Sequence, residues 1–143
     1  MIRHIWSVPC SLCITNDQTK NLTLIEVLEQ LNIQANSLPE GVEGGIAVTF
    51  DVASLWVREP IDQPTQGTGR ICILSPTGEV LETMPQYEID LATQPRARTI
   101  SRSRGLPVRG LGIYHLVVQL REGKETNWQD VARIPLEIRT LPS

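Results

Sequence analysis

The sequence opens with two cysteines at a spacing that can carry chemistry, Cys10 and Cys13. A C-x-x-C pair can be a redox couple where a strand runs into a helix, or half of a zinc site when a second pair follows. Here the pair lies inside an alternating, strand-like segment, and the third cysteine, Cys72, is isolated. A spacing of three sends two side chains to opposite faces of a strand. We therefore expect Cys10 to be a small core residue and Cys13 an outward thiol, both reduced and neither bound to a metal.

Residue types for acid–base or nucleophilic catalysis are few. The chain has two histidines, His4 and His115. It has no nucleophile-elbow, metalloprotease, P-loop or dinucleotide-binding motif. A carboxylate pair such as Glu88 and Asp90 has a spacing that is common on solvated strand faces. We expect no cofactor, no metal site and no enzymatic activity, with a small hydrolase or a thiol or zinc protein as the second alternative.

The sequence departs most from average composition in the placement of its arginines. Of the thirteen Lys and Arg residues, five lie between residues 96 and 109, and no Asp or Glu lies among them. The rest of the chain has eight basic residues and all sixteen acidic residues. These five are Arg96, Arg98, Arg102, Arg104 and Arg109. The first four share one parity, so an extended backbone places them on one side, with Ile100 among them. Arginine suits bidentate contacts with carboxylates and phosphates.

Two interpretations of this arginine segment stay open. It is either a structural feature, namely an edge strand protected by charge or a basic stripe neutralised by the chain's own carboxylates, or it is the binding surface for an acidic partner. Nucleic acid is the weaker form of the second interpretation. The whole chain carries a net charge of −3, and no aromatic residue lies between Pro95 and Arg109.

Composition favours strands as the elements that position these residues. Val, Ile and Thr total 37 against six Ala, and β-branched side chains suit the pleated surface of a sheet. Alternation and turn residues predict an all-β, two-sheet antiparallel β-sandwich of about eight strands, immunoglobulin-like or C2-like. The expected strands are 2–14, 22–32, 46–58, 69–75, 79–90, 97–104, 111–121 and 128–139.

The segment 22–32 is ambiguous, because Leu24, Val27, Leu28 and Leu31 also fit one face of a helix. A short polar turn after a strong first strand favours immediate antiparallel pairing, so we predict a strand there.

Four aromatic residues have structural interpretations. Tyr114 follows Gly112 at the start of a late strand, as in a tyrosine corner, where the hydroxyl bonds to nearby backbone. Trp6, Trp56 and Trp128 are expected in the core or at its rim rather than as a stacking platform for bases.

Three segments carry a resemblance to a known family: Trp6-Ser7-Val8-Pro9-Cys10-Ser11-Leu12-Cys13, Asn21-Leu22-Thr23-Leu24-Ile25, and Gly105-Leu106-Pro107 followed by Gly112-Ile113-Tyr114. With them the chain resembles a family of uncharacterised bacterial single-domain β-sandwich proteins (a domain of unknown function). The resemblance implies the sandwich fold and a bacterial or phage cytosolic setting, and no activity.

Length and hydropathy complete the prediction. The 143 residues fit one domain, 1–143, and no apolar run approaches the roughly 20 residues of a membrane helix. We expect a cytoplasmic, non-enzymatic binding or assembly module with no membrane contact, which binds an acidic protein partner or itself as a homo-oligomer. The first alternative is a polyanion or nucleic-acid binder that uses residues 96–109.

Overall fold

The computed structural model describes residues 1–34, 44–46 and 48–141, and in this part of the chain every regular element is a β-strand. The all-β prediction is confirmed. No helix of the described residues has the length and apolar character of a membrane span. The strands are β1 (Ile2–Thr15), β2 (Leu22–Val27), β3 (Gln30–Ile33), β4 (Gly44–Ile46), β5 (Phe50–Arg58), β6 (Thr65–Leu74), β7 (Val80–Thr83), β8 (Tyr87–Leu91), β9 (Arg96–Ser103), β10 (Leu106–Val108), β11 (Gly112–Glu122) and β12 (Gln129–Thr140).

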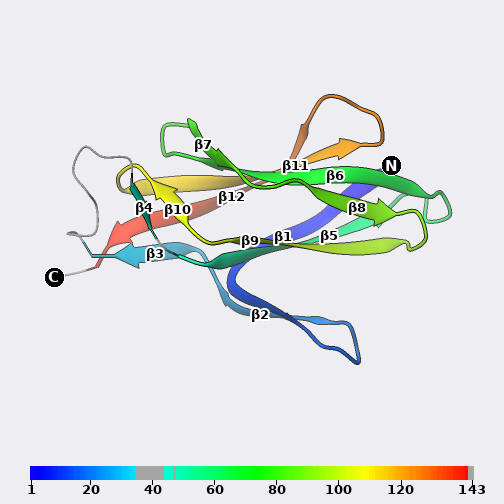
Figure 1. The fold of residues 1–143 in the computed structure, drawn as a ribbon, viewed down its shortest axis with the longest axis horizontal. Coiled ribbons are helices and arrows are strands. Elements are labelled where there is room, and N and C mark those ends of the chain that lie inside the picture. The colour runs from blue at the N-terminus through cyan, green and yellow to red at the C-terminus, as the bar shows by residue number, and fades with distance from the viewer. Residues whose placement is uncertain (35–43, 47, 142–143) are drawn as a thin grey trace.

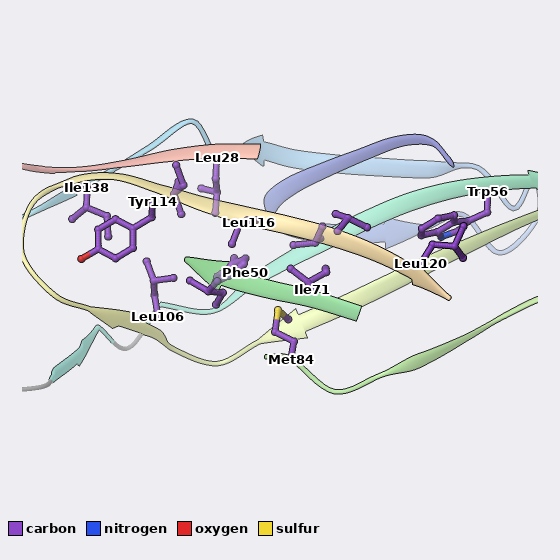
Figure 2. Close-up of a cluster of buried hydrophobic side chains, with 14 of the residues drawn as sticks. Leu28, Phe50, Trp56, Ile71, Met84, Leu106, Tyr114, Leu116, Leu120 and Ile138 are labelled. Carbon is purple, nitrogen blue, oxygen red and sulfur yellow. The ribbon is translucent and has the colours of Figure 1, made fainter. Parts of the chain in front are cut away.

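Two sheets pack face to face (Figure 1). The first has the order β2-β1-β5-β9, and the second has the order β3-β12-β11-β6-β7 with β8 also paired to β6. A short ribbon of β10 and β4 lies at one end. The core between the sheets is apolar, and Figure 2 shows part of it, including Phe50, Trp56, Ile71, Tyr114 and Leu116. The described residues form twelve strands rather than about eight, because several predicted strands divide.

The predicted strand 22–32 divides at Leu28 and Glu29. The helical alternative is wrong, since β2 pairs antiparallel with β1. Leu28 is buried in the main core, and its N–H donates to the Pro9 carbonyl over 2.8 Å. The chain thus passes from the first sheet to the second at Leu28. It keeps its direction, so β3 pairs parallel with β12, which corrects the prediction that all pairs are antiparallel.

Two other predicted strands also divide. The segment 79–90 forms β7 and β8, which pair with successive parts of β6 and are separated by the buried Met84 and by Pro85. Proline lacks an N–H for the ladder and therefore favours a break. The segment 46–58 forms the end of β4 and all of β5, with residue 47 outside the described residues. The short strand β10 was not predicted from the sequence.

The inward face of β1 changes along its length. The register with β5 shifts between His4 and Trp6, so Ile2 faces the main core whereas Trp6 and Cys10 belong to a second apolar cluster on the outer face. The single alternating face expected over 2–14 is therefore wrong beyond the bulge. An inserted residue reverses the side on which every later side chain lies.

The prediction for Tyr114 is confirmed. Its hydroxyl accepts the Arg109 N–H over 2.6 Å and donates to the Gly110 carbonyl over 2.7 Å, which is the tyrosine-corner arrangement. Among the tryptophans, Trp56 is fully buried, Trp6 is half-buried on the outer face, and Trp128 precedes β12. The guanidinium carbons of Arg70 and Arg121 lie 4.1 and 4.6 Å from the Trp128 ring centroid.

Candidate functional site

The outer face of the first sheet carries most of the arginine segment. Strand β9 is the last strand of that sheet and pairs with β5. Exposed and half-buried residues alternate along it, with the arginines at the exposed positions. In the register with β5, Arg96 lies opposite Val57, Arg98 opposite Leu55, Ile100 opposite Ala53, and Arg102 opposite Asp51.

Arg102 is neutralised by a carboxylate of its own chain. Its guanidinium donates to Asp51 over 2.8 and 3.2 Å, and Asp51 is 1% exposed. The Cys13 N–H also donates to Asp51, over 2.9 Å. The hydrogen bonds from Arg102 hold the pKa of Asp51 below its ordinary value, while burial opposes this shift. For Arg102, the interpretation as an internally neutralised charge is correct.

Arg109 lies apart from the others. It follows β10, and its Nη1 contacts the two carboxylate oxygens of Glu79 at 2.9 and 3.0 Å. The structure therefore does not bring all five predicted arginines to one surface. Arg96, Arg98 and Arg102 share the outer face of β9, and Arg104 follows the strand's end.

Arg96, Arg98 and Arg104 have a different environment from Arg102. All three are exposed, and none of their guanidinium groups has a hydrogen bond or an ion pair with a described residue. Arg104 and Arg102 line a hollow of about 590 Å³ beside Glu82 and Met84. Arg96 and Arg98 instead line a larger groove on the other part of β9.

This groove, of about 1080 Å³, lies between the β1–β2 hairpin and the outer face of the sheet. Trp6, Leu55 and Ile100 supply its apolar surface together with Leu22 of the hairpin. Its charged lining residues are Lys20, Arg96, Arg98 and Asp90, and its polar ones are Thr15, Thr19, Asn21 and Gln94. The groove thus combines an apolar surface with two more positive than negative groups, and we call it the arginine groove.

Sequence reasoning found the arginines but not the rest of the arginine groove. Trp6 reaches it only because the β-bulge after His4 turns this side chain outward. Asp51 offered one usable signal, because it is the only acidic residue in the apolar segment 50–57. A carboxylate in a buried strand needs a partner.

The two neighbouring cysteines lie on the same side of β1, which corrects the prediction for Cys13. Cys10 and Cys13 are 0% and 8% exposed, and both belong to the outer cluster with Ala53. The pairing of β1 with β5 ends at Cys10. On β2, Glu26 lies opposite Ser11 of β1 and has a left-handed backbone conformation, with a φ of 54°. Alternation therefore fails between the two cysteines.

The surroundings of Cys10 and Cys13 disfavour the thiolate form. Burial, followed by the nearby negative groups, raises the pKa of both Cys10 and Cys13. All three cysteines are free. Within the described residues no group of three or more His, Cys, Asp or Glu side chains is arranged to hold a metal ion.

A histidine–serine cluster that the sequence did not suggest lies between the sheets. His4 Nε2 is 2.7 Å from Ser7 Oγ, which is 2.6 Å from Ser54 Oγ. The His4 ring packs edge-on against Trp56, and burial lowers its pKa. A histidine beside a serine is the pattern of an activated nucleophile. Here, however, Ser7 contacts the buried Ser54, so the geometry is that of an internal polar network.

Comparison with protein-family models and with curated proteins finds no match. Among solved structures, the chain is similar to the C-terminal domain of wzt, with a TM-score of 0.45 and 20% identity over 64% of this chain and 60% of that one. The match thus spans less than two thirds of the length of that domain's chain. A second similar structure is the N-terminal domain of PorA, with a TM-score of 0.28 and 10% identity over 94% of this chain and 97% of that one.

Proposed function

We propose that this chain is a non-enzymatic binding module that contacts an acidic segment of another protein through Arg96, Arg98 and the arginine groove. One observation carries the proposal. On a single face of β9, Arg102 has a buried carboxylate opposite it, whereas Arg96 and Arg98 are exposed and have no ion-pair partner among the described residues.

Electrostatics and burial support an acidic ligand at this place. Side chains two residues apart on a strand lie only about 7 Å apart, so Arg96 and Arg98 repel each other until a negative group lies beside them. Guanidinium groups bind carboxylates in a bidentate geometry. The adjacent apolar surface of Trp6, Leu55 and Ile100 excludes water, which strengthens such contacts and adds apolar burial.

A polyanion such as nucleic acid or a sulfated polysaccharide is the alternative ligand for the same arginines. The net charge of −3 and the presence of Asp90 in the groove disfavour it, because long polyanions need an extended positive field. A second copy of this chain is another source of acidic surface, and it would make the protein a homo-oligomer. The thiol and hydrolase alternatives receive less support, since Cys10 and Cys13 are buried and Ser7 belongs to an internal network.

The setting and the fold type belong to the same proposal. We propose a cytoplasmic protein of bacterial origin, with an immunoglobulin-like or C2-like type of sandwich. Three free cysteines agree with a reducing compartment, and the tyrosine corner at Tyr114 is a feature of immunoglobulin-like domains.

Calorimetric titration with poly-L-glutamate, heparin and single-stranded DNA, at low and high salt, tests the proposed ligand class. We expect poly-L-glutamate to bind, to bind more weakly at high salt because exposed charge contacts are screened, and to bind at least about tenfold more weakly to Arg98→Glu. The matched control is Arg104→Glu, which makes the same charge change on an exposed arginine outside the arginine groove.

The other outcomes separate the alternatives. Binding of heparin or DNA without binding of poly-L-glutamate would replace the proposal by the polyanion alternative. Equal losses in Arg98→Glu and Arg104→Glu would show that net charge alone acts. A dimer mass by light scattering that becomes a monomer mass in Arg98→Glu would identify a second copy as the partner.

A further inference from the structure

The edge position of β9 bears on how a partner would bind. Within the described part of the chain, β9 pairs on one edge only, with β5, and it ends the first sheet (Figure 1). On the other edge no strand is hydrogen-bonded to β9 among the described residues, although β8 of the second sheet lies close to it, so the backbone N–H and C=O groups of this edge lack a strand partner. Strand addition at such an edge is a general mode of peptide recognition.

The arginines restrict which strand can be added. A second copy of β9 would place arginines beside arginines, and like charges on neighbouring strands are destabilising. Exposed positive charge therefore protects this edge against self-pairing. The same charges favour a strand with acidic side chains on the outer face, where Arg96 and Arg98 lie.

The side chains of β9 set an order of residues in the partner. On the outer face the sequence is Arg96, Arg98, Ile100 and Arg102. Ile100 is 43% exposed and forms part of the apolar surface of the arginine groove. Arg102 already has Asp51 opposite it and needs no further acid. Directly opposed side chains on neighbouring strands have Cβ atoms about 4.5–5.5 Å apart, close enough for each pair to interact.

Resting on the proposed function, we infer that the partner adds as a β-strand to the free edge of β9, with acidic residues beside Arg96 and Arg98 and an apolar residue beside Ile100. The partner motif is thus two acids and one apolar residue, each separated by one residue. The separating residues face the inner side of β9, beside Ala97, which packs against the main core, and Thr99, which accepts a hydrogen bond from Trp56, so we expect these residues to be small.

A set of short capped peptides tests this mode of binding in the full chain. The parent peptides contain two glutamates and one valine, alternating with threonines, in both chain directions so that parallel and antiparallel addition are covered. The matched isomer has the same composition but places the two glutamates side by side. We expect calorimetry to show at least about tenfold tighter binding of one parent than of the isomer, and loss of that binding in the Arg96→Glu variant.

Backbone methylation separates strand addition from charge attraction alone. Alternate N–H groups of an extended strand point to the same edge, so N-methyl groups on one alternate set of residues block pairing with β9 and those on the other set do not. We expect one methylated peptide to lose binding and the other to retain it. If both bind like the parent, strand addition is wrong although acid binding stands. If no glutamate peptide binds, the proposed function is wrong as well.

Discussion

Tyr114 and Tyr87 provide a matched pair of perturbations with opposite expected results. Removing the hydroxyl in Tyr114→Phe deprives the Arg109 N–H and the Gly110 carbonyl of their partner. Each lost hydrogen bond costs about 1 kcal/mol net, so the expected loss is about 2 kcal/mol. The unfolding entropy of a chain of 143 residues is about 0.3 kcal/mol/K, which converts this loss into a decrease of about 7 °C in Tm.

Tyr87→Phe makes the same chemical change where no hydrogen bond is lost. The Tyr87 hydroxyl is buried and has no hydrogen-bond partner among the described residues. Burial raises its pKa. Removing an unpaired buried hydroxyl is neutral or stabilising, so we expect no decrease in Tm. Thermal unfolding of both variants by circular dichroism is the assay, and equal shifts in the two would refute this reasoning.

Three further variants test the surroundings of the candidate site. The pKa of Asp51 is lowered in the folded state, so the stability that its charged form contributes is present above the unfolded-state pKa and is lost as pH falls through the folded-state pKa. Urea unfolding should therefore show that Asp51→Asn is less stable than the wild type at pH 7. This difference in the free energy of unfolding should shrink toward pH 3. Burial lowers the pKa of His4 below 6.5, so the wild type should lose stability as pH falls below about 6.5, and His4→Gln should lose less between pH 7.5 and pH 5.5. Cys10→Ser should cost about 1–3 kcal/mol because the new hydroxyl is buried among apolar groups. The control Cys72→Ser should cost less, since Thr83 and Gln119 already lie at hydrogen-bond distance from that sulfur; a larger loss in the control would contradict the argument.

Strand type was predictable from local pattern, whereas strand boundaries depended on contacts that are distant in sequence. The alternation from 2–14 and 97–104 marks strands close to β1 and β9. The break at Leu28 was not visible, because a leucine continues the local pattern equally well in either sheet. Its position follows from burial in the core between the sheets and from the Pro9 carbonyl. Local periodicity thus reports that a residue is in a strand, but not which sheet it joins.

The candidate site shows the same division. Parity alone places Arg96, Arg98 and Arg102 on one side of a strand, and the structure has them there. The pairing of Arg102 with Asp51 joins residues 51 positions apart, and it depends on the register of β5 with β9. No local pattern separates Arg102 from Arg98, although Arg102 forms an ion pair with Asp51 and Arg98 forms none with any described residue.

The register therefore places the arginines of β9 in two different environments. A uniform stripe of positive charge would be explained fully by protection of an edge strand, and every arginine in it would be equivalent. Asp51 breaks this equivalence, because it neutralises the outer-face position at the Arg102 end of β9 and leaves the positions at the Arg96 end exposed. The exposed end is also the end that lines the arginine groove with Trp6 and Leu55. Charge that served only to prevent self-pairing would not need to coincide with that apolar surface, and this coincidence is why we propose binding for Arg96 and Arg98 and a structural role for Arg102.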